Sequence, residues 1–236
     1  MNQGVYSLAA TMVNQLNRVD VLSNNLANAN TTGFKQDNLT QGSFNYYLEK
    51  SAKENIQTTN LNITNNTVPK IDGNFMSSVH GAVVTTGNEL DFAINERDVF
   101  FKVEGLNKDV LLSKDGSFKN KDGFLVNSDG QYILNNDNER IAVDDGFESL
   151  ISLVKTSFNN ISKVGNNNYK ISDTKQTTNI VDNDPYLLQG SIEKSNVNTI
   201  TTMVSLIDSQ RRLEQAQKAS VGIDEINQKL IDKLTR

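Results

Sequence analysis

The chain has 236 residues, a formal net charge of -5 and a pI of about 5.0, a balance that argues against nucleic acid as its main partner. Hydrophobic residues make up 36% and aromatic residues 7%, so we expect a thin core and a chain that orders in part only when a partner covers it. The absence of Cys excludes disulfide bonds and thiolate metal sites, and no run of about 18 apolar residues predicts a membrane span.

The first predicted element is a long helix over Val5–Asn28. Its apolar residues recur every three or four positions, at Val5, Leu8, Met12, Leu16, Val19, Leu22 and Leu26. Only Arg18 and Asp20 are charged between residues 1 and 34. Uncharged amides can be buried at low cost when each finds a hydrogen-bond partner, so we expect protein to pack on several sides of this helix. An ordinary amphipathic helix on its own domain is the alternative.

The middle of the chain is predicted to be irregular first and β-rich afterwards. Residues 36–80 are polar and weakly periodic, which indicates an extended or irregular connector. Residues 81–185 favour a domain of short antiparallel strands, with "VFFKVEG" as a more buried strand. Three Asp-Gly pairs supply the positive φ of tight turns and predict a β-meander: Asp115-Gly116, Asp122-Gly123 and Asp129-Gly130.

A second long helix is predicted within residues 186–236, with Ser195 as its N-cap. An apolar stripe begins with Ile200, Met203, Val204 and Ile207, and no charge occurs from residue 195 to residue 207. We expect the two charge-poor terminal helices to pack on each other in a coiled-coil-like layer. The predicted class is therefore α+β, with segments 1–35 and 186–236 in the helical layer, a connector over 36–80 and a β-rich domain over 81–185.

No pattern of catalytic or ligand-binding residues emerges from the sequence. His80 is the single histidine, and one imidazole without Cys cannot form a structural zinc site, so a satisfied or solvent-facing loop residue is the expectation. Nucleophile, phosphate-binding and dinucleotide-binding motifs are missing, and most Asp residues are explained by turns. We therefore expect no enzyme activity, no cofactor and no metal.

Three ordered stretches carry a resemblance to a known family. "LSNNLANANTTGFK", Leu22–Lys35, closely resembles the N-terminal signature of the bacterial flagellar rod and hook family. Thr85–Ile94 looks like the central motif of that family, and Leu187–Ala219 is similar to its C-terminal motif. The matching residues are Asn25, Leu26, Asn28, Asn30, Thr31, Gly33, Phe34 and Lys35 in the first motif, and Gln189-Gly190, Glu193 and Ser195-Asn196-Val197-Asn198 in the last.

The chain also departs from the family pattern at three places. Asp98-Val99 stands where a Gly is usual, Leu112-Ser113-Lys114 replaces a Tyr-Thr-Arg, and the aromatic residue expected near Leu213 is missing. These departures concern the subtype within the family.

The resemblance implies a structural subunit of the flagellar basal-body rod, which spans the periplasm, polymerising through its terminal helices into the tubular drive shaft. The proximal-rod type fits first and the distal-rod type next; a hook-like axial protein, a β-rich adhesin on a helical stalk and a cell-wall hydrolase are the alternatives. The implied partners are copies of the chain, other rod and hook proteins and the flagellar type III export apparatus, without nucleic acid or direct membrane insertion.

The expected assembly residues lie on the two helices and in the block that follows the first. Gly33 is expected to turn the chain sharply, and Phe34 to anchor the next residues in an apolar pocket. A mere helix stop is the alternative reading of that block. The full expected set is Val5, Leu8, Met12, Leu16, Val19, Leu22, Asn25, Leu26, Asn28, Asn30, Thr31, Gly33, Phe34, Asn196, Val197, Ile200, Val204 and Ile207.

Overall fold

The computed structural model describes residues 2–43, 69–180 and 185–234 of the chain. They form two compact units. The helical unit comprises the described residues within 1–27, 37–75 and 198–236, and the β unit those within 28–36 and 76–197. The expected segments 1–35 and 186–236 thus each contribute to both units, and residues 44–68 of the expected connector lie outside the described part.

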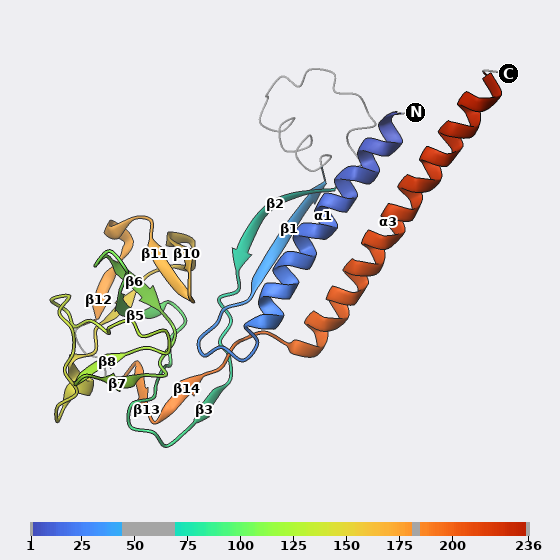
Figure 1. The fold of residues 1–236 in the computed structure, drawn as a ribbon. Coiled ribbons are helices and arrows are strands. Elements are labelled where there is room, and N and C mark those ends of the chain that lie inside the picture. Colours follow the sequence, from blue (N-terminus) through green and yellow to red (C-terminus); the bar gives the residue numbers. More distant parts are fainter. Residues whose placement is uncertain (1, 44–68, 181–184, 235–236) are drawn as a thin grey trace. The chain divides into compact units, whose positions relative to one another are not determined.

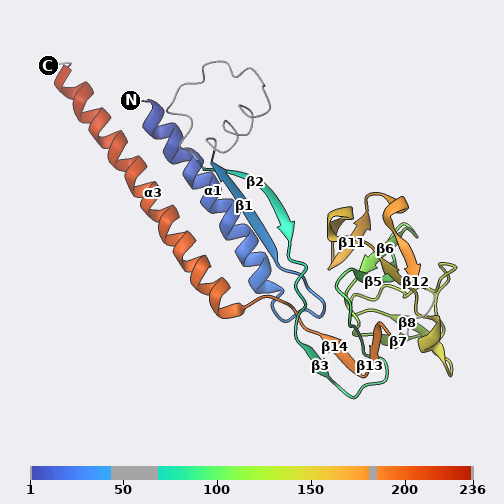
Figure 2. The ribbon, with the colours of Figure 1, turned by 180° about the vertical axis from the view of Figure 1, so that it is seen from behind.

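Two long helices dominate the helical unit. Helix α1 spans Asn2–Ala27 and helix α3 spans Thr199–Leu234. They pack side by side and run in opposite directions, as both ribbon views show (Figures 1 and 2). Strands β1 (Asp37–Ser43) and β2 (Pro69–Met76) pair in a two-stranded sheet, and β1 contacts α1. The prediction of two packed terminal helices is confirmed.

The face that α3 turns toward α1 differs from the expected one. The buried residues of α3 are Thr202, Ser209 and Ala216, with exposed fractions of 3%, 3% and 6%. They recur every seven residues, as in a coiled-coil seam, and their small side chains permit a close approach of the helices. The first four residues of the predicted apolar stripe, Ile200, Met203, Val204 and Ile207, are exposed instead, so the expectation that they contact the first helix is wrong.

The start of α3 is capped one turn later than predicted. The side-chain Oδ1 of Asn198 accepts a hydrogen bond from the backbone N–H of Thr201 at 3.1 Å, which satisfies a donor that the first turn leaves free. Ser195 lies outside the helix and accepts from the N–H of Val197 at 3.3 Å. The N-cap is therefore Asn198 and not Ser195.

A six-stranded antiparallel sheet organises the β unit, in the order β10-β11-β6-β5-β9-β12. Two-stranded ribbons β13-β4, β14-β3 and β7-β8 complete the unit. The strands are β3 (Val83–Thr85), β4 (Phe92–Ile94), β5 (Val99–Glu104), β6 (Val110–Ser113), β7 (Lys119–Lys121), β8 (Phe124–Val126), β9 (Leu153–Lys155), β10 (Ile161–Gly165), β11 (Asn168–Ile171), β12 (Thr178–Ile180), β13 (Leu187–Gln189) and β14 (Ser191–Glu193). Short 3-10 turns lie at Phe147–Leu150, Phe158–Asn160 and Thr174–Gln176.

Strand β5 is buried on both faces, as its sequence predicts. Phe101 packs into a cluster with Val99 and Val103, whereas Phe100 lies in a second cluster with Leu112. Successive side chains of a strand point to opposite faces, so the continuous apolar run supplies two cores. The rigid centre of the β unit is therefore this strand.

Only part of the predicted meander is formed. Asp122 and Gly123 have φ of 54° and 84° and join β7 to β8 in a tight hairpin. At the first Asp-Gly pair, by contrast, the carboxylate of Asp115 is buried and accepts hydrogen bonds from the N–H groups of Ser117 and Ser128. Burial raises the pKa of the Asp115 carboxyl, although these hydrogen bonds partly oppose the shift. Asp115 is a buried polar anchor, and the prediction of a hairpin there is wrong.

None of the helices in the described part of the chain combines the length and the apolar character that crossing a membrane requires.

Candidate functional site: a buried polar network and an exposed helix face

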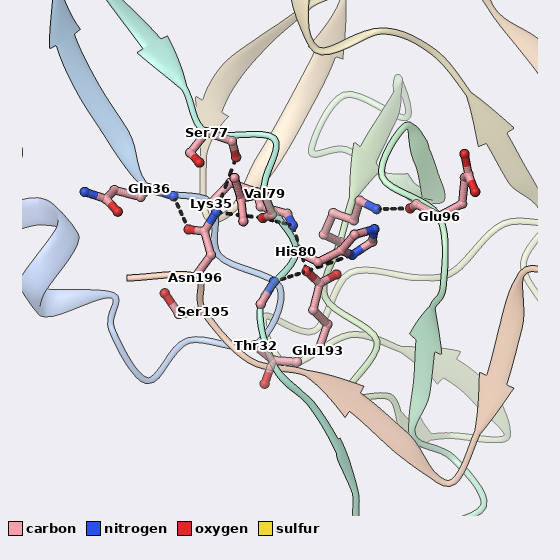
Figure 3. A network of polar contacts seen from close by, with 12 residues as sticks. Thr32, Lys35, Gln36, Ser77, Val79, His80, Glu96, Glu193, Ser195 and Asn196 are labelled. Atoms are coloured by element: carbon pink, nitrogen blue, oxygen red, sulfur yellow. Dashed lines mark hydrogen bonds and ion pairs between the residues drawn. The ribbon is translucent and has the colours of Figure 1, made fainter. Parts of the chain in front are cut away.

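Three segments that are far apart in the sequence meet inside the β unit. Residues 32–36 follow the first helix, residues 77–81 follow β2, and residues 193–196 follow β14. Figure 3 shows the side chains of Lys35, Glu193 and Asn196 meeting one another's segments and the main chain of the third segment. We call this cluster the Lys35–Glu193 network; it comprises Lys35, Gln36, Ser77, Val79, His80, Gly81, Glu193 and Asn196.

A buried ion pair forms the centre of the network. Lys35 Nζ lies 2.7 Å from Glu193 Oε1, and the two side chains are 1% and 2% exposed. Lys35 Nζ also donates to the carbonyl oxygen of Val79 at 3.0 Å, and the N–H of Gly81 donates to Glu193 Oε1 at 2.8 Å. Buried charges are tolerated when they are paired and hydrogen-bonded, as Lys35 Nζ and Glu193 Oε1 are, whereas Glu193 Oε2 is buried without a hydrogen-bond partner. The pair therefore links all three segments.

Asn196 makes a second connection through its side-chain amide. Its Oδ1 accepts from the N–H of Gln36 at 2.7 Å, and its Nδ2 donates to the carbonyl oxygens of Val79 at 2.8 Å and Ser77 at 3.4 Å. Main-chain bonds run in parallel: the N–H of Gly33 donates to the carbonyl oxygen of Glu193 at 2.7 Å. The side-chain amide of Asn offers both a donor and an acceptor, so it can bind two segments of the same chain at once, which explains the use of Asn here.

Gly33 adopts a conformation and occupies a space that suit glycine alone. Its φ is +67°, in the left-handed region that L side chains rarely adopt. A Cβ at this position would lie 2.2 Å from the carbonyl oxygen of Lys114. The sharp turn predicted at Gly33 is thus confirmed, and the close approach to the Lys114 main chain adds a second requirement.

Phe34 is buried within the β unit rather than at a surface. Its side chain is 4% exposed, and Lys163 Nζ lies 4.3 Å from the centroid of its ring. The same Nζ donates to the carbonyl oxygen of Lys35 at 2.7 Å. The cation–π contact and the hydrogen bond from Lys163 together hold the main chain directly after Phe34 in place.

Two further titratable groups border the network. His80 Nδ1 lies 3.5 Å from Glu193 Oε1, and burial lowers the pKa of His80 although the carboxylate partly opposes the shift. Lys114 is buried and donates from Nζ to the carbonyl oxygen of Glu96 at 2.8 Å; burial lowers the pKa of Lys114 to about 7. His80 thus contacts the carboxylate of Glu193, and Lys114 binds a main-chain oxygen. Within the described ranges, no set of three or more His, Cys, Asp or Glu side chains could hold a metal ion.

Asn25 plays a comparable part within the helical unit. Its Nδ2 donates to the carbonyl oxygen of Asp37 at 2.8 Å, and its Oδ1 accepts from the N–H of Asp37 at 2.9 Å. The side chain is fully buried and pairs with the start of β1 as a neighbouring strand would. This amide is satisfied within its own chain, so the expectation that it serves an intersubunit contact is wrong.

The expected assembly residues fall into three groups. Asn25, Gly33, Phe34 and Val197 are buried inside the chain, and Asn196 belongs to the network; these positions stabilise the single chain. Exposed positions are Leu16, Asn30, Ile200, Val204 and Ile207. The remainder of the helical set is half-buried, namely Leu8, Met12, Val19, Leu22, Leu26, Asn28 and Thr31, and the side chain of Val5 lies outside the described part.

The α3 row, which we define as Ile200, Met203, Val204 and Ile207, is an exposed apolar face of the helical unit. Ile200 is 78% exposed and Val204 62%. The residues recur at steps of three and four, so they lie along one side of α3, and no charged residue occurs before Asp208. A continuous exposed apolar surface of this kind marks an interaction site.

Sequence reasoning did not find the ion pair of the network. Lys35 and Glu193 both stand in motifs that resemble the family, but 158 residues separate them along the chain. Neither local periodicity nor spacing relates them.

Comparison with known proteins gives a consistent result. A family model described as flagella basal body rod protein matches residues 6–35, and one described as flagellar basal body rod FlgEFG protein C-terminal matches residues 188–233. The flagellar basal-body rod protein FlgF of Caulobacter vibrioides is 28% identical over 253 residues, covering 99% of this chain and 98% of the relative. FlgG of Buchnera aphidicola subsp. Schizaphis graminum is 30% identical (90% and 92% covered), and FlgG of Bacillus subtilis 27% identical (98% and 99% covered).

Proposed function

The chain belongs to the family of flagellar basal-body rod proteins, and we propose that it polymerises through its terminal helices into the tubular shaft that transmits torque. Members of this family are structural components of the basal-body rod. The chain is accordingly a rod subunit that assembles with other rod and hook components. The residues that make the contacts, and the route of export, are parts of the proposal.

The α3 row is the observation that carries the proposal. Full burial of a Val or Ile side chain stabilises an association by about 1.5–3 kcal/mol relative to exposure. Many weak contacts of this kind, repeated by helical symmetry, can hold a shaft together, because a head-to-tail interface that does not close gives an open polymer. Because residues 195–207 carry no charge, burying them in an interface does not incur the desolvation cost of charged side chains.

The Lys35–Glu193 network also supports the proposal that the helical unit, and not the network, makes the assembly contacts. It holds the family-like residues of the first and last motifs inside the β unit, where they complete that unit. Most polar groups of the network thus bind partners within the β unit, whereas the α3 row of the helical unit is exposed. This contrast supports α3 as the assembly surface.

We further propose that the flagellar type III apparatus exports the chain. The charge-poor N-terminal segment, with Arg18 and Asp20 as its charged residues up to residue 34, supports this route. A β-rich adhesin on a helical stalk would need sustained charged flanking positions along its heptads, which the first helix does not have.

Val204→Glu tests the assembly surface. A carboxylate in the middle of the α3 row cannot be buried without a partner, so we expect the variant to be lost from isolated basal bodies and swimming to fail. Helical content of the purified variant should stay unchanged, because Val204 is exposed in the single chain. The measurement is immunodetection of the chain in basal bodies of cells that carry only the variant.

Ser205→Glu is the matched control, since it adds the same charge one position along, on a neighbouring side of the helix. We expect this chain to be incorporated. Normal incorporation and motility of Val204→Glu would show that the α3 row is not an assembly surface.

A further inference from the structure

The two ends of α3 expose different apolar surfaces. The first is the α3 row near its start. The second lies near its end, where Ile226 is 61% and Leu230 43% exposed. The helix between them carries charged side chains, beginning with Asp208, Arg211 and Arg212, together with the exposed Val221.

The exposed surface near the end continues the seam that faces α1. The seam positions Thr202, Ser209 and Ala216 are buried, Ile223 is half-buried, and the next position at the same seven-residue spacing is Leu230. Burial thus declines along one face of α3 while the residues on it become more apolar. A leucine at such a position is typical of a helix–helix contact.

The lengths of the two helices explain this decline. Helix α3 has 36 residues and α1 has 26, and in both ribbon views α3 continues past α1 at its C-terminal end (Figures 1 and 2). At 1.5 Å per residue, the difference corresponds to about 15 Å of helix. The α3 row covers about 11 Å by the same measure, so it fits within the length of α3 that has no α1 beside it.

We propose that the end of α3, at Ile226 and Leu230, packs against the α3 row of a second copy of this chain. The inference rests on the proposed function and deepens it by naming the two surfaces that meet. In this arrangement the second copy packs on α3 beyond the first residue of α1, where the contact between α1 and α3 within one chain stops.

Polarity favours this pairing over contact between identical surfaces. Two α3 rows facing each other would form a closed, two-fold dimer, whereas two different surfaces form an open chain with one direction, as a shaft requires. The α3 row is uncharged, so it places no like charge against Asp224, Glu225 or Lys229 near the other end. Apolar residues at steps of three and four on both surfaces also match the spacing of interlocking helices.

Because the chain has no cysteine, thiol cross-linking gives a direct test. Three full-length chains are produced in motile cells: Val204→Cys, Leu230→Cys, and the double variant. Within one helix the two positions are about 39 Å apart, so a short bifunctional thiol reagent cannot join them in the same molecule. Isolated basal bodies are treated with the reagent, and the chain is detected after denaturing electrophoresis.

We expect both single variants to remain monomeric and the double variant to give a ladder of dimers, trimers and longer products. Dimers from either single variant, or monomers alone from a double variant that is present in basal bodies, would overturn the head-to-tail contact while leaving the rod function intact. Absence of the unsubstituted chain from basal bodies would overturn the proposed function itself, and this inference with it.

Discussion

Glu193→Gln is expected to lower the free energy of unfolding of the β unit by about 3–5 kcal/mol, because it leaves the buried ammonium of Lys35 without a counter-ion. Gln also weakens the hydrogen bond that the carboxylate accepts from the N–H of Gly81. Since the chain has two units, the effect is best measured by hydrogen exchange of amides in β5, which report on opening of the β unit.

Glu96→Gln provides the control within the same unit. Glu96 Oε1 lies 3.7 Å from Lys155 Nζ, and both side chains are nearly half exposed, so water screens this pair and its loss should change exchange little. Equal effects of the two substitutions would contradict a stabilising role for the Lys35–Glu193 network.

Gly33→Ala is expected to destabilise the β unit by more than about 4 kcal/mol, the range reserved for severe backbone or core defects. The added Cβ meets the main chain of Lys114, which cannot move as a flexible side chain can. It also forces an L side chain into the left-handed region, at a cost of about 1–2 kcal/mol. Denaturant titration followed by hydrogen exchange of the same β5 amides measures the loss.

Gly87→Ala separates the two contributions. Gly87 has φ of +73°, close to that of Gly33, but a Cβ there meets no atom within 4 Å. We expect its substitution to cost only the conformational strain. If both substitutions lower the free energy of unfolding equally, the close packing of Gly33 against Lys114 does not contribute to stability.

Periodicity and turn chemistry were sufficient for much of the fold. They predicted both terminal helices, the doubly buried strand β5 and the positive φ at Gly33 and Asp122-Gly123. These features depend on residues close together in the chain, so a single sequence contains the information. The α+β class follows from the same local patterns.

The face of α3 that meets α1 could not be predicted in that way. An apolar stripe indicates that a helix face is buried, but not whether the partner is the same chain or another one. Here the small residues Ser209 and Ala216 lie between the helices, while the larger Ile200 and Val204 remain exposed. The pattern identified an apolar face, and which face of α3 meets α1 depends on helix spacing that the sequence does not record.

Polar residues were the other source of error. The amide of Asn25 and the carboxylate of Asp115 look like parts of a surface block and a turn, yet each is buried and binds a main-chain group 12 or 13 residues away. Lys35 and Glu193 meet across 158 residues. Residues so far apart in the chain share no local pattern, so a single sequence gives no signal for such pairs.

The central claim is that the α3 row is exposed to solvent in the single chain and buried in the rod. The direct measurement is the rate at which a thiol reagent modifies Val204→Cys, compared between the purified chain and isolated basal bodies and normalised to the denatured chain. We predict rapid modification of the purified chain and strong protection in basal bodies. Equal rates in the two states would contradict assembly through α3.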